Sequence, residues 1–203
     1  LRLTFKYPTF GLNRVYLGAS KLSFNLDYLV CVNRLVLSQF GSEIEGVRCK
    51  KFLSWDSRTN FMALDDILWL NPGLQFQSFS KDITRGLNPA ATVTFAALQI
   101  IYFMGFEKVV ILGMDHSFSL KKSTVPNTTE VYNHEEDVNH FLPNYFPKGV
   151  KWETPDLVSS EHFYSIAREV YEQAGRRIVD CTTGGQCLVF EKGVLSNELE
   201  SSQ

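Results

Sequence analysis

A group of polar residues closely follows the most apolar strand-like run of the chain. Asp115, His116 and Ser117 come one residue after residues 109–113, which read Val-Val-Ile-Leu-Gly. In open parallel α/β sheets, ligands bind outside the carboxyl ends of the strands. This position predicts Asp115 as a catalytic residue and His116 and Ser117 as ligand contacts. The alternative is that Asp115 caps a local turn and His116 is a rim residue whose hydrogen bonds are satisfied.

A second candidate is His140, in the aromatic segment Asn-His-Phe-Leu-Pro-Asn-Tyr-Phe of residues 139–146. A histidine beside aromatic rings suits general-base work near neutral pH. Tyr145 of the same segment is a candidate ligand contact. The alternative, which the residues alone favour, is a loop histidine that is bonded to backbone.

Two asparagines end apolar runs, and each is followed by arginine. Asn13 and Arg14 close the run Phe-Gly-Leu, and Asn33 closes Val-Cys-Val. An amide at a strand end can bind a base, ribose or sugar, or it can form an Asx-turn. The repetition of Asn-Arg favours ligand binding by Asn13, Arg14 and Asn33.

Two further segments are candidates for phosphate binding. Asn88-Pro89 is a good N-cap and first-turn pair for an apolar helix that ends at Met104, and Thr92 and Thr94 lie near its start. A helix N-terminus favours anions, although ordinary capping explains the same residues. Thr182, Thr183 and Gly184 follow a strand and form either a phosphate-facing loop or, as we favour, a tight turn.

A metal site is the minority interpretation. His116, His134, Asp137 and His140 could join Asp115 around an ion, but their spacings match no compact ligand signature. Residues 134–137 are more simply a solvated acidic loop. The four cysteines contain no CxxC pair and are predicted to be reduced and mostly buried. No metal ligand is therefore predicted.

The elements that must position these residues follow from periodicity. Aromatic and β-branched runs predict strands at residues 9–13, 28–33, 51–55, 109–113, 177–179 and 187–190. Residues 160–174 form an amphipathic helix that Gly175 ends. The succession of strand, helix and strand predicts an α/β fold with a mostly parallel sheet.

Length and composition restrict the classes of function that the protein can have. The 203 residues predict one domain at residues 1–197, with a lid or insert at 114–157 and a frayed tail at 198–203. A net charge of −2 argues against nucleic acid as a partner. Neither a signal peptide nor a membrane span is visible, which predicts a cytoplasmic protein.

Five segments also occur in an order typical of a known family. They are residues 9–17 (TFGLNRVYL), 27–33 (DYLVCVN), 91–98 (ATVTFAAL), 104–118 (MGFEKVVILGMDHSF) and 139–146 (NHFLPNYF). Over residues 5–190 the chain resembles the 6-hydroxymethylpterin diphosphokinase MptE-like domain family. More remotely, it is similar to bacterial sialyltransferases and flagellin-modifying glycosyltransferases.

The resemblance implies a Rossmann-like three-layer sandwich and a nucleotide-dependent transferase. On the sialyltransferase side, Asn13 and Asn33 match nucleotide- and sugar-contacting asparagines, the helix start near Thr92 faces the donor phosphate, and His140 matches the general base. The reaction is then glycosyl transfer from a nucleotide-sugar donor, plausibly CMP-linked, to a glycan or small-molecule acceptor, as in polysaccharide biosynthesis. On the pterin side, the enzyme is a diphosphokinase using ATP and Mg²⁺, with Asp115 near the metal or phosphate.

The chain departs from the family pattern at two places. The family carries a Gly-x-Gly-Pro-Ser phosphate loop ahead of the segment that matches residues 5–13, and this chain starts after that point. Residues 91–93 also read Ala-Thr-Val where the sialyltransferases have Thr-Ser-Gly. A third hypothesis is therefore a non-catalytic nucleotide- or glycan-binding remnant.

Overall fold

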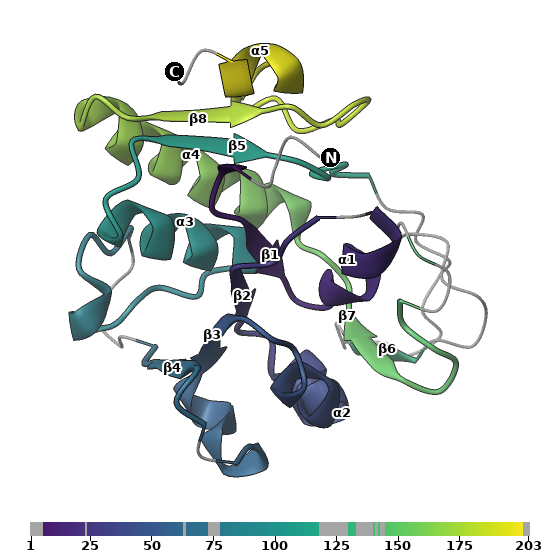
Figure 1. The fold of residues 1–203 in the computed structure, drawn as a ribbon. Coiled ribbons are helices and arrows are strands. Elements are labelled where there is room, and N and C mark those ends of the chain that lie inside the picture. Colours follow the sequence, from purple (N-terminus) through teal and green to yellow (C-terminus); the bar gives the residue numbers. More distant parts are fainter. Residues whose placement is uncertain are drawn as a thin grey trace. The chain divides into compact units, whose positions relative to one another are not determined.

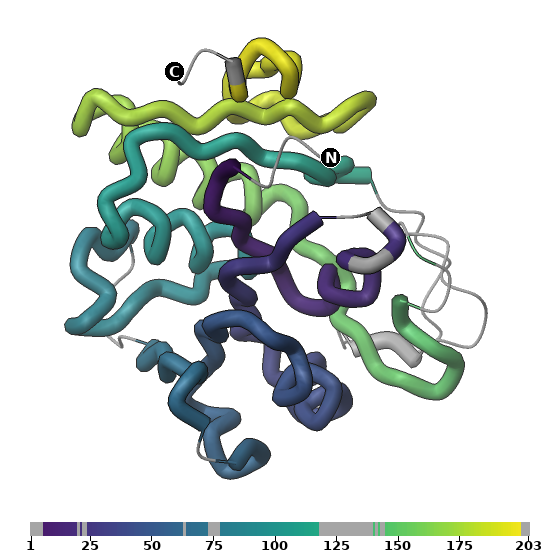
Figure 2. Tube along the Cα trace, viewed as in Figure 1, coloured from purple at the N-terminus to yellow at the C-terminus, as the bar shows by residue number. Residues whose placement is uncertain are grey.

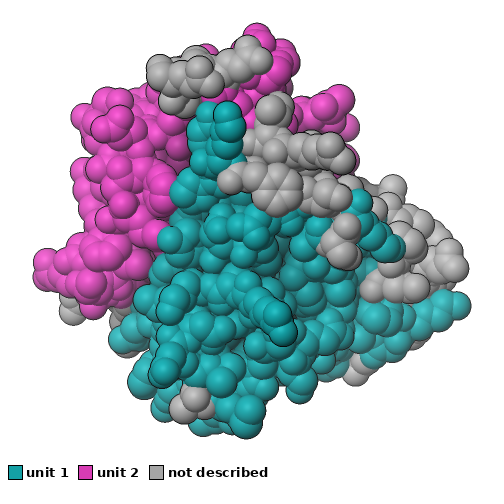
Figure 3. Space-filling model, viewed as in Figure 1, with its two compact units in different colours: residues 1–71, 118–155 teal, residues 72–117, 156–203 magenta. Residues whose placement is uncertain are grey.

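The structure is a computed structural model of the chain. The described residues are 6–22, 24–62, 64–72, 78–117, 130–132, 140, 142 and 145–200. Two compact units divide the chain, and Figure 3 colours them teal and magenta. Unit 1 is Leu1–Asn71 with Phe118–Pro155, and unit 2 is Pro72–Ser117 with Asp156–Gln203.

Unit 1 is built on a four-stranded parallel sheet (Figure 1). Its strands lie in chain order: β1 (Phe10–Leu12), β2 (Tyr28–Cys31), β3 (Lys50–Ser54) and β4 (Ile67–Leu70). The connections run through α1 (Tyr16–Leu22), α2 (Arg34–Glu45) and the 3₁₀ helix η2 (Trp55–Asn60). Figure 2 shows this path as a tube that runs from purple to blue. A separate antiparallel pair joins β6 (Glu130–Tyr132) to β7 (Lys151–Glu153).

The core of unit 1 lies between the sheet and α2. Apolar residues at helical spacing on α2, among them Val36, Leu37 and Ile44, pack against Leu29 and Leu53 of the strands. Strands β2 and β3 are buried over almost their whole length, as expected for central strands of a parallel sheet. Because β1 and β2 pair in parallel, their carboxyl ends lie side by side at the same end of the sheet.

Unit 2 has a smaller sheet with order β5-β8-β9, also parallel. Its elements are η3 (Ile83–Arg85), α3 (Val93–Phe103), β5 (Lys108–Ile111), α4 (Leu157–Gln173), β8 (Arg177–Asp180), β9 (Glu191–Lys192) and α5 (Leu195–Glu200). Phe95, Leu98 and Tyr171 pack with Ile178 in its core. The helices α3 and α4 thus cover their own unit's strands.

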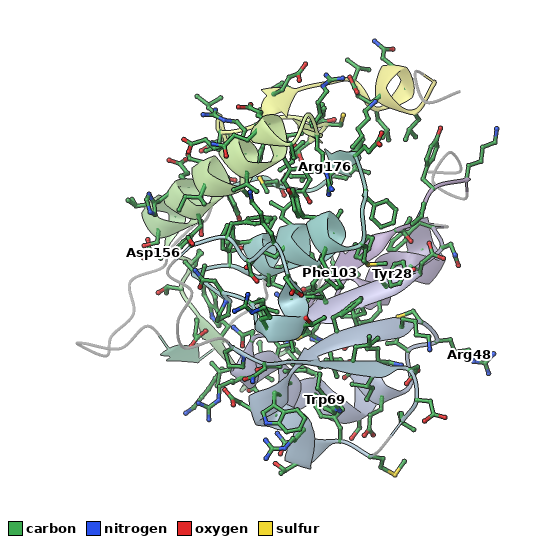
Figure 4. All side chains as sticks on the ribbon, turned by 90° about the vertical axis from the view of Figure 1, so that its left-hand side faces the viewer. Tyr28, Arg48, Trp69, Phe103, Asp156 and Arg176 are labelled. Atoms are coloured by element: carbon green, nitrogen blue, oxygen red, sulfur yellow. The ribbon has the colours of Figure 1, made fainter. Side chains whose placement is uncertain are left out.

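Both ends of α4 are fixed by side chains, and Figure 4 labels Asp156 and Arg176 there. The Asp156 carboxylate accepts a hydrogen bond from the backbone N–H of Ser159 at 2.9 Å and caps the helix. The hydrogen bond from the Ser159 hydroxyl, together with this backbone bond, holds the pKa of Asp156 below its usual range. Beyond the C-terminus, Arg176 donates to the Tyr102 carbonyl at 2.7 Å and lies over the Tyr102 ring.

The prediction of a Rossmann-like α/β fold with parallel sheets is confirmed. Five predicted strands are present, whereas residues 187–190 are not a strand. Cys187 and Phe190 are buried there in irregular chain, so their apolar side chains fill the core without pairing in the sheet. None of the described helices is long and apolar enough to cross a membrane.

The start of the apolar helix also differs from the prediction. Thr92, rather than Asn88, is the N-cap, and the helix begins at Val93. The Asn88 side chain accepts from the N–H of Ala90, whose φ of 46° is not helical. A local Asx-type turn therefore competes with the first helical turn at Asn88-Pro89.

Parts of the predicted lid and tail fall outside the description. Of residues 114–157, the structure describes 114–117, 130–132, 140, 142 and 145–157, so the lid stays a prediction. The single domain at 1–197 likewise stays a prediction beside the two compact units. Residues 198–200 of the predicted frayed tail belong to α5, and the Lys108 ammonium donates to the Glu198 carbonyl at 2.7 Å.

The four cysteines are free, and three of them are buried, as predicted. Burial raises the pKa of the Cys31 thiol to about 12 and that of Cys49 to about 11. Burial also raises the pKa of Cys181 and Cys187. At pH 8 a thiol with a pKa near 12 is only about 10⁻⁴ ionised, and the thiolate is the reactive form.

We therefore expect the native protein to react slowly with 5,5′-dithiobis(2-nitrobenzoate) at pH 8. In urea, all four thiols should react quickly and release four equivalents of thionitrobenzoate. Raising the pH toward 10 should accelerate the native reaction, because a larger thiolate fraction forms. One thiol titrating rapidly in the native protein at pH 8 would contradict this expectation.

Candidate ligand-binding site

A cavity of about 130 Å³ opens in unit 1 beyond the carboxyl ends of β1 and β2. Its walls come from the residue after β1, the start of α2, residues 140, 145 and 146, and β7 with Pro155. In parallel α/β sheets this edge is where ligands bind. The cavity lies entirely within residues of unit 1.

Asn13 lines this cavity at the end of β1. Its backbone N–H donates to the Val30 carbonyl at 2.9 Å, which ties the residue to the end of β2. Its φ of 50° lies in the left-handed region, which asparagine tolerates better than most residues. The side-chain Oδ1 is buried and has no hydrogen-bond partner among the described residues.

Asn33 also lines the cavity, but its amide is used within the protein. Its Oδ1 accepts from the Val36 N–H at 3.1 Å and caps α2. Its Nδ2 donates to Oε2 of Glu153 at 3.0 Å. The Asn33 oxygen therefore makes the local backbone contact of the Asx-type alternative. The amide nitrogen holds the Glu153 carboxylate at the cavity.

His140, Tyr145 and Phe146 form an aromatic wall of the cavity. The His140 and Tyr145 rings stack with centroids 4.2 Å apart and planes at 3°. Phe146 meets the His140 ring nearly at right angles, with centroids 5.1 Å apart. This packing fixes the plane of the imidazole. His140 is half-buried rather than sealed in the core.

Arg14 lies behind this wall and supports it. The guanidinium donates to the Tyr145 carbonyl and, at 2.9 Å, to Glu43, and it lies 3.6 Å from the centre of the Phe40 ring. The Arg14 backbone N–H donates to the Tyr145 hydroxyl at 3.0 Å. These contacts link Arg14 to Tyr145, Glu43 and Phe40, and its predicted contact with substrate stays a prediction.

The structure adds a wall that sequence reasoning missed. Lys151, Trp152 and Glu153 of β7 line the cavity. The Gln39 side chain holds β7 beside α2: its amide donates to the Lys151 carbonyl at 2.9 Å and its Oε1 accepts from the Lys151 N–H at 2.8 Å. No local pattern indicates this placement, because it depends on contacts 112 residues apart in sequence.

The other predicted site residues lie in unit 2, where two strand-end loops meet. The Met114 N–H donates to the Thr182 hydroxyl at 2.9 Å, and the Gln186 N–H donates to the Asp115 carbonyl at 2.9 Å. The loops after the parallel strands β5 and β8 are thus joined. Asp115, Ser117, Thr183 and Gly184 are exposed in these loops.

His116 and Thr92 make contacts with α4. The His116 Nε2 lies 3.0 Å from Oε1 of Glu161, and the His116 ring is 6.2 Å from that of Tyr164. The Thr92 hydroxyl lies 3.1 Å from the Tyr164 hydroxyl and accepts from the half-buried Thr94 N–H at 3.3 Å. Burial raises the pKa of Tyr164, so its hydroxyl stays neutral. Thr92 therefore acts as the N-cap of α3, which is the capping alternative to phosphate binding.

Metal binding receives no geometric support from the described residues. Among them, no group of three or more histidine, cysteine, aspartate or glutamate side chains is arranged to hold a metal ion. His134 and Asp137 of the minority metal interpretation lie outside the described residues.

Four of the predicted residues are therefore brought together at one cavity: Asn13, Asn33, His140 and Tyr145. The comparisons with protein-family models, curated proteins and solved structures give no match for this chain.

Proposed function

We propose that the protein is a nucleotide-dependent transferase that moves a sugar from a nucleotide-activated, CMP-linked donor to a hydroxyl acceptor. The observation that carries this proposal is the cavity at the carboxyl ends of β1 and β2, which collects Asn13, Asn33, His140 and Tyr145. The two asparagines and the histidine come from segments separated by 20 and 107 residues, yet they line one space.

In this proposal His140 acts as the general base. The imidazole takes the proton of the acceptor hydroxyl, the acceptor oxygen forms a bond to the anomeric carbon, and the bond from that carbon to the phosphate oxygen breaks. The departing nucleotide keeps the electron pair on its phosphate and needs little acid assistance. Positioned proton transfer of this kind contributes roughly 10²–10⁴-fold to a rate. The catalytic role predicted for Asp115, which lies in unit 2, stays a prediction.

Ligand-dependent thermal stabilisation tests the proposal. We expect CMP and CDP to raise the melting temperature, because a ligand that binds only the folded state stabilises it by mass action. ATP with Mg²⁺ and hydroxymethylpterin should leave it unchanged. A shift with ATP–Mg²⁺ and the pterin instead would support the diphosphokinase alternative and contradict glycosyl transfer.

Substitution of His140 tests the mechanism. His140→Phe keeps an aromatic ring to stack on Tyr145 but cannot accept a proton, so we expect kcat to fall by roughly 10²-fold or more, with CMP binding nearly unchanged. His162→Ala, on the exposed side of α4, is the matched control and should retain full turnover. An unchanged rate in His140→Phe would remove His140 from the mechanism. CMP binding without turnover by the wild-type protein would make it a binding protein.

A further inference from the structure

We propose that Arg14 is a positioning residue for the imidazole of His140, and that it acts through Tyr145. This inference rests on the proposed function, because it gives Arg14 the task of holding the general base in one plane. It differs from a ligand contact, since the guanidinium then binds the wall behind His140 rather than the substrate. A positioning residue of this kind affects kcat more than it affects the affinity for nucleotide.

Arg14 holds Tyr145 at two points, which lie at opposite ends of that residue. The backbone N–H of Arg14 donates to the Tyr145 hydroxyl at 3.0 Å, and the Arg14 guanidinium donates to the Tyr145 backbone carbonyl. One bond fixes the tip of the phenol ring, and the other fixes the backbone from which the ring extends. Both bonds are buried, and they join residues 131 positions apart in the sequence. A ring that is held at its tip and at its base has little freedom to tilt.

The imidazole of His140 takes its plane from the Tyr145 ring. The two rings stack with centroids 4.2 Å apart and planes at 3°. Phe146 meets both of them edge-on, at 86° to the His140 ring and at 89° to the Tyr145 ring. Rings that stack face to face must turn together to stay in contact, so a tilt of Tyr145 would be passed to the imidazole. A general base works only within a narrow range of distance and angle to the proton that it removes.

The helix α2 in turn holds the Arg14 guanidinium. Nη2 of Arg14 donates to the Glu43 carboxylate at 2.9 Å, and the Tyr16 hydroxyl donates to the same carboxylate oxygen at 2.9 Å. The guanidinium carbon lies 3.6 Å from the centre of the Phe40 ring. Arg14 is only 3% exposed, so these contacts offset the free energy that burial of its charge costs. The two bonds to Tyr145 are therefore anchored to α2, which carries Glu43 and Phe40.

The chemistry of this position suits arginine rather than lysine. A guanidinium is planar and presents its N–H groups in fixed directions. One side chain can therefore donate to the Tyr145 carbonyl and to Glu43 while its face lies on Phe40. An ammonium is a compact point charge without a flat face. Arg14→Lys thus keeps the charge but loses the geometry, which separates positioning from neutralisation of Glu43.

NMR of the full chain tests the positioning without requiring turnover. Protons over the face of an aromatic ring are shifted upfield, so the imidazole C–H signals of His140 should lie upfield of those of a free histidine. His140→Phe identifies these signals among those of the four histidines. In Arg14→Lys we expect them to move toward the positions of a free histidine, because the Tyr145 ring is no longer held.

The matched control is Arg176→Lys. Arg176 also donates to a backbone carbonyl and lies over the ring of the same residue, which is Tyr102. The control therefore removes the same kinds of contact from a different aromatic side chain. It should leave the His140 signals and the turnover unchanged.

Kinetics give the second readout. We expect Arg14→Lys to lower kcat by roughly 10–10²-fold, while KM for the donor and the affinity for CMP stay nearly unchanged. A loss of stability alone would not produce this split, because each variant is measured at a temperature where circular dichroism shows it folded. Glu43→Gln keeps an oxygen that accepts from the guanidinium but removes the charge. It should give a smaller fall in kcat and a smaller shift of the His140 signals, and it replaces Arg14→Lys if that variant does not fold.

Two results would overturn the inference. The first is a set of His140 signals that is not upfield in the wild-type protein or that Arg14→Lys leaves in place, even if turnover depends on His140. The second is a loss of CMP affinity in Arg14→Lys as large as the loss of kcat, which would make Arg14 a ligand contact. Movement of the His140 signals in Arg14→Lys but not in Arg176→Lys would support the inference. If the wild-type protein then showed no turnover, only the proposed function would be contradicted.

Discussion

Replacing Gln99 with leucine should lower the free energy of unfolding by roughly 3–5 kcal/mol, although leucine suits the apolar helix α3 in every local respect. Gln99 is fully buried. Its Oε1 accepts from the backbone N–H groups of Ser80 and Asn88 at 2.9 and 3.1 Å. Its Nε2 donates to the carbonyls of Asn88 and Phe95 at 2.7 and 3.1 Å.

The physical reason is that leucine would leave several buried backbone groups without partners. Ser80 and Asn88 are themselves buried, so water cannot readily replace the lost bonds. Each unsatisfied group costs roughly 1–3 kcal/mol, while leucine regains only apolar burial. Gln99 thus ties the segment before α3 to the helix.

Equilibrium unfolding in urea measures this effect. Ile100→Leu is the control, because it changes shape at the neighbouring buried position without touching a hydrogen bond and should cost less than about 1.5 kcal/mol. If Gln99→Leu were as stable as Ile100→Leu, the four hydrogen bonds would not carry the stability assigned to them.

The second large effect is expected from Asp66. Lys51 is fully buried in β3, where its ammonium donates to the Asp66 carboxylate and, at 3.3 Å, to the Cys49 carbonyl. Asp66→Asn leaves that ammonium without a counter-charge, and breaking a buried pair in this way costs roughly 3–5 kcal/mol. Because the Asp66 side chain is 36% exposed, water relieves part of the cost, and we expect roughly 2–4 kcal/mol.

The converse substitution should behave differently. Lys51→Met removes the buried charge and fills the space with an apolar chain, and Asp66 can then be solvated at the surface. We therefore expect Lys51→Met to cost less than Asp66→Asn, and Lys51→Met with Asp66→Asn to recover most of the loss. A double-mutant cycle in urea measures the pairing, and equal losses in the two single variants would contradict this account.

Much of the fold could be predicted from local pattern. Five strands and the two helices α3 and α4 follow from apolar runs and helical spacing. The strand predicted at residues 187–190 was wrong, because Cys187 and Phe190 are buried by packing rather than by pairing. Apolar composition reports burial but does not distinguish a sheet from irregular chain. The helix α2 was not predicted, although Asn33 caps it.

The candidate site could be predicted in part. The idea that polar residues at strand ends face a ligand identified Asn13 and Asn33, and the aromatic segment identified His140 and Tyr145. Glu153 was missed because nothing in its neighbourhood marks it. Its place opposite Asn33 depends on a hydrogen bond between residues 120 positions apart.

By itself, the sequence determined the α/β class, most of the strands, and the chemical types at the strand ends, because these depend on interactions over a few residues. Only the tertiary structure decided which of those groups meet. In that structure the Asn33 oxygen caps α2 and its amide nitrogen donates to Glu153, Arg14 lies behind the aromatic wall, and the Asn13 Oδ1 has no partner among the described residues. The reason is that the partner of a polar atom is set by packing between distant segments, and local periodicity carries no information about it.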